Sequence, residues 1–253
     1  RRGRGAVGQP TNTHCYDAPM RLLAIDTSAA HCSAALYDAG SLIQRIAPAQ
    51  RRHGERILGM MEDLLRTAGL RAADLDAFAF ARGPGSFTGL RIAAAVVQGA
   101  ALATEKPIVA VSTLAALAQG CRRDAGAQRV LAALDARMGE VYAGAYAADA
   151  QGLMVAVADD QVCAPEAVRV PGGPGPWMAA GSGWDTYGAV LAGAVRAVSG
   201  ADPARVDAQR PCEAQDVAVL AAAAYAAGAL LDPADAQPVY LRDRVTSNAP
   251  ARG

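Results

Sequence analysis

Two stretches of this chain repeat one pattern of apolar and polar positions, 109 residues apart. In the first, the apolar run RLLAID (21–26) is followed by a small polar turn and a second apolar run, CSAALY (32–37). In the second, VLAALD (130–135) is followed by a turn and by EVYAGAY (140–146). Short apolar runs bounded by turn residues are typical of buried strands. We therefore predict two similar hairpins, each with an aspartate at its tip, and an internal duplication of two α/β halves.

The same pattern predicts the remaining elements. In the first half these are strands over 41–47, 77–81 and 107–111, and helices over 55–68, over 88–103 and from the cap Ser112 to about Arg122. In the second half they are strands over 153–158 and 177–180, a loop over 171–176, a helix over 214–231 and an extended tail over 238–244. The last helix is apolar all round, so we expect it to be buried on more than one side and to return to the first half.

The order of elements in the first half, β-β-β-α-β-α-β-α, is that of the half-unit of the actin, sugar-kinase and Hsp70 superfamily. We therefore expect an α/β protein with an actin-like (ASKHA) fold, made of two tandem ribonuclease-H-like α/β domains. The first domain is predicted over 20–125 plus 212–245, and the second, smaller domain over 126–211. Residues 1–19 are basic and rich in Gly and Pro, so we expect a disordered tail and no secretory signal.

A glycine-rich turn, RGPGSFTGLR (82–91), separates a predicted strand from a predicted helix. Gly83 and Gly85 permit positive φ or close backbone approach, and Ser86 or Thr88 can cap the helix. A helix N-terminus of this kind suits either an anion or a close backbone contact, and the glycines leave both interpretations open. The string matches neither G-x-G-x-x-G nor the P-loop pattern.

Composition excludes several classes of protein. The formal net charge is zero and the pI is near 7.0, so no overall basic character points to nucleic acid. The five cysteines contain no C-x-x-C, which favours reduced thiols in a cytosolic protein. The three histidines contain no H-x-x-x-H pair, so we expect no two-histidine metal site. The apolar runs are too short or too interrupted for us to expect a membrane span.

Strings along most of the chain resemble the TsaB (YeaZ) family, the partner subunit in bacterial threonylcarbamoyl-adenosine modification of tRNA. They are LLAIDTS (22–28), HGERILGMMEDLL (53–65), RGPGSFTGLRIA (82–93), VSTLAALAQG (111–120), LAALDARMGEVYAG (131–144), AGSGW (180–184) and PVYLRDRV (238–245), in family order. GPGSFTGLR and DARMGEVY are the most specific of these. The chain departs from the family before Met20 and over 171–210, outside the main motifs.

The resemblance implies a cytoplasmic, largely non-catalytic subunit with the actin-like fold. It implies partnership with the catalytic threonylcarbamoyltransferase TsaD, with the small ATPase TsaE joining the complex. The modified base would be adenosine 37 of tRNAs that read codons beginning with A, and tRNA would bind only within the complex. The resemblance also implies a homodimer of the isolated chain, formed through the surface that binds TsaD.

Three residues, Asp26, Thr27 and Ser28, stand where an actin-like ATPase places its first phosphate loop. They would hold a metal-bound water and donate to phosphate, or alternatively satisfy the N–H groups of their own turn. The bulky string 136–138 replaces a second phosphate loop, which argues against independent ATP hydrolysis. We expect no catalytic residue, no metal ligand and no intrinsic cofactor, with ATP or ADP and Mg binding at most at a site shared with the partner. The candidate nucleotide- or phosphate-binding residues are Asp26, Thr27, Ser28, Gly83, Gly85, Ser86 and Asp135.

Two charged residues, Arg137 and Glu140, flank the second turn. One interpretation is an ion pair at the tip of the hairpin. The other is a contact to the partner or to a bridging phosphate.

The helices 55–68 and 88–103 are the expected partner surface. A helix on one side of a sheet should show a polar face, yet the second of these has no charge between Arg91 and Glu105. Small residues allow another helix to approach closely, and Met is common on adaptable binding surfaces. We expect a four-helix interface with the partner, the alternative being burial within this chain. The expected interface residues are Ile57, Met60, Met61, Leu64, Leu65, Ile92, Val96 and Gln98.

Three other functions deserve comparison. An independent actin-fold ATPase or small-molecule kinase would need tight ATP binding and turnover by the isolated chain. A metallopeptidase would need H-x-x-x-H or H-E-x-x-H, which the sequence lacks. A stripe of Arg51, Arg52 and Arg56 could contact tRNA within a complex.

Overall fold

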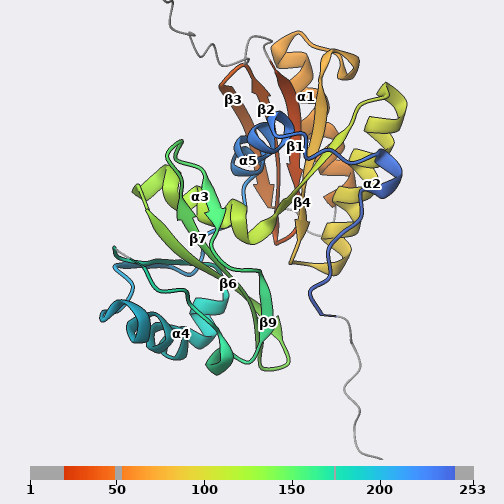
Figure 1. The fold of residues 1–253 in the computed structure, drawn as a ribbon. Helices are drawn as coiled ribbons and strands as arrows, with labels where there is room; N and C mark the ends of the chain where they lie inside the picture. The colour runs from red at the N-terminus through yellow and green to blue at the C-terminus, as the bar shows by residue number, and fades with distance from the viewer. Residues whose placement is uncertain (1–19, 49–52, 174, 243–253) are drawn as a thin grey trace, which may run out of the picture.

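The computed structural model describes residues 20–48, 53–173 and 175–242. The predicted disordered tail 1–19, the arginines at 51 and 52, and the chain beyond Arg242 lie outside the described residues. The described chain forms two sheets, drawn one above the other in Figure 1, with helices between them and on their outer faces.

The first sheet has the strand order β3-β2-β1-β4-β5. Its strands are β1 (Arg21–Asp26), β2 (His31–Asp38), β3 (Ser41–Pro48), β4 (Ala77–Gly83) and β5 (Ile108–Ser112). The second sheet has the order β11-β10-β6-β7-β8, with β9 paired to β7. Its strands are β6 (Arg129–Arg137), β7 (Glu140–Ala148), β8 (Met154–Ala156), β9 (Gln161–Cys163), β10 (Met178–Ala180) and β11 (Arg205–Asp207). The helices are α1 (His53–Ala68), α2 (Phe87–Thr104), α3 (Thr113–Ala125), α4 (Gly183–Ser199) and α5 (Ala214–Ala226).

The two sheets are copies of one topology, which confirms the predicted duplication and the actin-like fold. In each, the first two strands form an antiparallel hairpin, with Leu23 opposite Leu36 in one and Ala132 opposite Gly144 in the other. In each, the strand before a long helix, β4 or β10, runs parallel to the first strand, and the next strand runs parallel to that one. The second half replaces α1 by β9 and a single 3-10 turn, Pro165–Ala167.

The buried side chains form three clusters, because alternate residues of the first strand in each sheet point to opposite faces of that sheet. In β1, Leu22 and Ala24 face a central cluster, whereas Leu23 and Ile25 face an outer cluster covered by α1 and α2. In β6, alternate residues likewise divide between the central cluster and a second outer cluster covered by α4. The molecule is therefore layered as helices, sheet, helices, sheet, helix.

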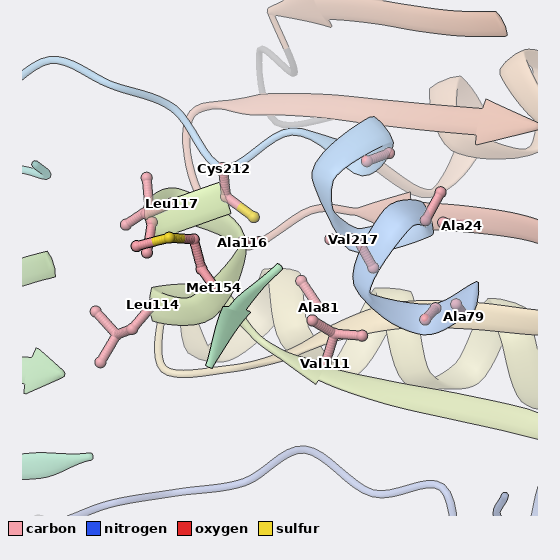
Figure 2. Packing of buried hydrophobic residues seen from close by; sticks show 14 of the residues in the cluster. Ala24, Ala79, Ala81, Val111, Leu114, Ala116, Leu117, Met154, Cys212 and Val217 are labelled. Carbon is pink, nitrogen blue, oxygen red and sulfur yellow. The ribbon is translucent and has the colours of Figure 1, made fainter. Parts of the chain in front are cut away.

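The middle layer consists of α3 and α5, and each contacts the sheet of the opposite half. The helix α5, which follows the second sheet in sequence, packs on β1, β2 and β4, as its apolar composition predicted. The helix α3, which follows the first sheet, packs on β6, β7 and β8. Figure 2 shows part of the central cluster, with Val217 of α5 close to Ala24 and Ala79 of the first sheet and with Met154 beside α3. Alanines on the sheet face leave room for a helix to lie close.

The structure differs from the sequence-based expectation in two helices. The pattern did not predict α4, because Gly183, Gly188 and Gly193 weaken its helical signal, although Trp184 and Leu191 are buried seven residues apart. The helix α5 ends at 226 rather than at the expected 231. Gly228 follows in the left-handed region, with φ of 76°, and residue 231 then forms a bridge with β5.

Candidate functional site

A cavity of about 570 Å³ lies between the two halves, where the two hairpin turns face each other. Its lining comes from the first turn, from the N-terminal ends of α2 and α3, from the second turn, from the residue preceding α4, and from the segment before α5. The lining residues include Ser28, Gly85, Ser86, Phe87, Thr113, Asp135, Arg137, Ser182, Arg210 and Cys212.

The first turn is closed on itself. Asp26, Thr27 and Ser28 are buried, with exposed fractions of 1%, 0% and 5%. The Ser28 amide donates to Asp26 Oδ1 at 3.0 Å, and the Thr27 hydroxyl donates to the Gly89 carbonyl at 2.7 Å. These bonds correspond to the second of the two interpretations of the turn, in which side chains satisfy local groups. Asp26 and Thr27 are therefore absent from the lining of the cavity, whereas Ser28 belongs to it.

The glycine-rich segment packs directly on this first turn. The Ser86 amide donates to the Ser28 carbonyl at 2.7 Å. A Cβ atom at Gly85 would lie 2.8 Å from that carbonyl oxygen, and one at Gly89 would overlap the carbonyl oxygen of Thr27. These glycines are required for close backbone contact. Ser86, one of the two caps that the sequence allowed, caps α2 by accepting from the Gly89 amide at 3.3 Å.

Gly83 packs against a different part of the chain, the C-terminal segment. With φ of 118°, it lies against the C-terminal segment, and a Cβ atom there would lie 2.7 Å from the Val239 carbonyl oxygen. The Val239 amide donates to the Arg82 carbonyl at 2.8 Å. Gly83 therefore belongs to the packing of the tail and does not line the cavity.

The second turn has the same amide-to-aspartate hydrogen bond as the first, but its aspartate also forms an ion pair. The Arg137 amide donates to Asp135 Oδ1 at 2.8 Å, which matches the bond from Ser28 to Asp26 at the equivalent positions. The Arg137 guanidinium also pairs with Asp135, at 3.0 Å. Glu140 pairs instead with Arg242, so the first of the two interpretations, an ion pair between Arg137 and Glu140, is wrong. The reason is that the tail returns to the hairpin and supplies a nearer cation.

Burial sets the protonation of the acid in the first turn. It raises the pKa of the Asp26 carboxyl to about 6, an effect that the Ser28 hydroxyl and amide and the Cys212 thiol offset only in part. Burial also raises the pKa of the Cys212 thiol well above its usual value. A thiol held in this way is not a reactive nucleophile. Among the described residues, no three His, Cys, Asp or Glu side chains are grouped so that they could hold a metal ion.

Sequence reasoning missed the counterpart of the glycine-rich segment in the second half. Gly181 and Gly183 lie against Ala133 of β6, as Gly85 and Gly89 lie against the first turn. Between them, Ser182 accepts a hydrogen bond from the Asp135 amide at 3.2 Å. The string GSG at the end of a predicted strand was the available signal.

The expected partner residues divide into two sets. Ile57 and Leu64 are fully buried and Met61 is 7% exposed, all in the outer cluster of the first half, so these three contribute core and offer almost no surface. The others line the outer surface of α1 and α2 and are partly exposed. They are Met60, Leu65, Ile92, Val96 and Gln98.

The surface between and around these residues is apolar and contains exposed helical glycines. Leu58 is 50% exposed and Leu102 is 64% exposed. Gly59 of α1 and Gly99 of α2 are exposed, and a Cβ atom at either would meet nothing within 4 Å. By length and a mean hydropathy of 1.3, α2 would qualify as a membrane span, yet it lies on the first sheet as a partly buried core helix. We refer to the exposed side of α1 and α2 as the helix-pair surface.

A family model described as TsaD: tRNA N6-adenosine threonylcarbamoyltransferase matches residues 46–230. The chain is 40% identical over 228 residues to the tRNA threonylcarbamoyladenosine biosynthesis protein TsaB of Escherichia coli strain K12, covering 89% of this chain and 96% of that protein. It is 34% identical to the Haemophilus influenzae protein of the same name, covering 90% and 95%. The structure of YeaZ from Pseudomonas aeruginosa is similar, with a TM-score of 0.80, 43% identity, and coverage of 88% of this chain and 100% of that chain.

Proposed function

The chain belongs to the TsaB family, and on that premise we propose that it is a non-catalytic subunit required for threonylcarbamoyl transfer to N6 of adenosine 37 in tRNAs that read codons beginning with A. It acts in the cytoplasm by binding and activating TsaD together with TsaE. In isolation it forms a homodimer through the helix-pair surface, the surface that also binds TsaD. It contacts tRNA only within the complex.

The observation that carries this proposal is that exposed helical glycines and exposed leucines occur together on the helix-pair surface. A glycine inside a helix costs about 1 kcal/mol relative to alanine. Nothing in the described part of the chain requires that cost at Gly59 or Gly99, because a Cβ atom at either position would meet open space. A second pair of helices that approaches the backbone closely gives both glycines a role.

Exposed apolar side chains around those glycines support the same conclusion. Leu58 and Leu102 are at least half exposed, and the partly exposed Ile92 and Val96 lie on the same two helices. Apolar side chains left exposed on two adjacent helices of a sheet-packed layer are typical of a protein interface. The expected partner therefore presents apolar helices of its own.

The closed first turn supports a non-catalytic role. The Asp26 carboxylate accepts from its own turn, and the Thr27 hydroxyl donates to a backbone carbonyl. Groups that an ATPase would direct at phosphate and metal are thus engaged within the chain. Catalysis then falls to the partner.

Light scattering after gel filtration tests the proposal, on the chain alone and mixed with TsaD from the same organism, with and without ATP. We expect a homodimer that exchanges into a heterodimer with TsaD. Val96→Glu and Gly99→Leu should each abolish both associations, because the first buries an unpaired charge and the second fills the space a partner helix needs. Both variants should fold, since Val96 is only partly buried and Gly99 faces open space.

The matched control is Gly193→Leu on α4. Gly193 is also an exposed helical glycine with nothing within 4 Å, but it lies on the helix that covers the outer face of the second sheet. This variant should associate as the wild type does. A monomer that ignores TsaD and hydrolyses ATP unaided would overturn the proposal and favour an independent ATPase.

A further inference from the structure

A groove of about 480 Å³ lies at the C-terminal end of α2. One wall is the end of α2 with the residues that follow it, and the other is the segment that leads from α5 into the 3-10 turn Pro233–Asp235. Figure 1 shows that turn beside α2. The lining includes Leu102, Glu105, Lys106, Leu230, Asp232 and Pro233, and it shares no residue with the cavity at the two hairpin turns.

The groove continues the helix-pair surface. Leu102 belongs to both, because it lies on α2 with 64% of its surface exposed and also lines the groove. Leu230, on the opposite wall, is 42% exposed. Leucine side chains gain their burial energy only when a second surface covers them. A partner that lies on the helix-pair surface is therefore next to two leucines that it can cover at the end of α2.

Glu105 ends α2 in a backbone conformation that its residue type does not favour. Its φ is 55° and its ψ is 41°, in the left-handed region where glycine is the usual residue at a helix end. A carboxylate is also unfavourable there, because the C-terminus of a helix carries partial negative charge. The last turn of α2 has no basic residue to offset either charge. Local rules that are broken without a gain inside the chain are typical of functional sites.

The groove is acidic on balance. Glu105 and Asp232 stand against one cation, Lys106. Among the described residues, no cation forms an ion pair with Glu105. Pro107 has no N–H group, and the Ile108 amide donates to a carbonyl of the opposite wall at 3.0 Å, so neither supplies a donor to the last carbonyl groups of α2. A cation from outside the chain would therefore be stabilised here.

We propose that this groove binds a segment of the partner in which an apolar side chain stands next to a lysine or arginine. The apolar side chain covers Leu102 and Leu230, and the cation pairs with Glu105 at the negative end of α2. The inference rests on the proposed function, because the groove is reached from the helix-pair surface. It adds a second, charged contact to an interface that is otherwise apolar.

A second copy of this chain is a poorer source of that cation. The helix α2 has no charged residue between Arg91 and Glu105. The Arg91 guanidinium lies over an aromatic ring at the opposite end of α2, at 3.8 Å. On α1, Arg56 is partly buried, and Arg66 pairs with Asp63 of its own helix. The heterodimer is therefore the complex in which the groove is filled.

The affinity of the chain for immobilised TsaD from the same organism tests this inference. Glu105→Gly and Leu230→Ser should each weaken binding about tenfold, and Glu105→Lys should weaken it further. The loss caused by either Glu105 variant should shrink at high salt, which screens the charge contact. Glu105→Gly should melt no lower than the wild type, because glycine adopts this φ at no steric cost, so weaker binding cannot come from a weaker fold.

The matched control is Glu166→Lys, which changes the net charge by the same amount as Glu105→Lys. Glu166 is exposed in the 3-10 turn of the second half, and this variant should bind TsaD as the wild type does. If Val96→Glu abolishes binding while the Glu105 and Leu230 variants bind unchanged, the proposed function stands and this inference is wrong. Equal weakening of the homodimer by Glu105→Lys would overturn it in favour of a second copy. Binding that Val96→Glu leaves intact would overturn the proposed function and this inference with it.

Discussion

The Asp26 side chain is an acid placed by the fold where its charge is unfavourable. It sits at the end of β1 with 1% of its surface exposed, and burial raises its pKa to about 6. Unfolded, the same carboxyl titrates near pH 4. Between these values the folded protein holds a proton that the unfolded chain has lost, so the free energy of unfolding falls as pH rises from about 4 to about 6.

Asp26→Asn should remove that part of the pH dependence. Above about pH 7 the variant should be more stable than the wild type by up to about 3 kcal/mol, and below about pH 3 the two should be equal, because the wild-type carboxyl is then protonated in both states. The asparagine Oδ1 can still accept from the Ser28 amide. Urea unfolding of both proteins across this pH range measures the difference. A constant difference at all pH values would mean that the carboxyl is not the titrating group.

At the scale of elements, a partly buried ion network joins the two middle helices. Arg123, near the end of α3, pairs with Asp216 of α5 at 2.8 Å, and Arg210 pairs with Asp124 at 3.0 Å and Asp207 at 3.1 Å. The Asp216 side chain is 3% exposed, and burial raises its pKa to about 7 against the opposing effect of Arg123. Since α3 and α5 each pack on the opposite sheet, this network helps fix the two halves relative to each other.

Arg123→Leu should destabilise the protein by about 3 kcal/mol above pH 8, because it leaves the Asp216 carboxylate buried without its nearest cation. The loss should shrink near pH 6, since Asp216 is then protonated. Denaturant unfolding at the two pH values checks this. The double variant Arg123→Leu with Asp216→Asn provides the control and should recover most of the loss at high pH; failure to recover would show that Arg123 acts through packing alone.

At the scale of the whole molecule, the C-terminal segment connects the two halves on one side of the junction. The Val239 amide bonds to Arg82 of β4, and the Tyr240 hydroxyl accepts from Arg91 of α2 at 3.0 Å. Two residues later, Arg242 pairs with Glu140 at the start of β7. The segment thus ties the first sheet to the tip of the second hairpin, where Arg137 and Met138 both hold positive φ.

Arg242→Gln should release that tip without unfolding the halves. The pair with Glu140 is partly exposed, so the loss in the free energy of unfolding should stay below about 1 kcal/mol. Hydrogen exchange of the amides at 137–140 should rise, while that of β1 and β4 should stay unchanged. Glu140→Gln should give the same local result, and equal exchange in the wild type and both variants would rule out this role for the tail.

Local chemistry was readable from the sequence alone. Alternating and continuous apolar runs located both hairpins, and the cap Ser86 and the helices α1, α2 and α3 followed from their residues. The offset of 109 residues located the duplication, because each half uses the same residues to end a strand in an aspartate and a tight turn. These features depend on neighbours within one or two turns of chain, which is why a sequence pattern can carry them.

Only the tertiary structure decided which side chains are buried, which are exposed, and which distant groups pair. Ile57 and Met60 lie on the same helix, and only the packing of α1 on β2 shows that the first is core and the second is surface. Glu140 lies three residues from Arg137, yet it pairs with Arg242, which is 102 residues away in the chain. Ser28 of the first turn and Asp135 of the second turn line one cavity because the two halves face each other across it. Contacts between distant segments depend on how the two halves stack, and no local pattern encodes that arrangement.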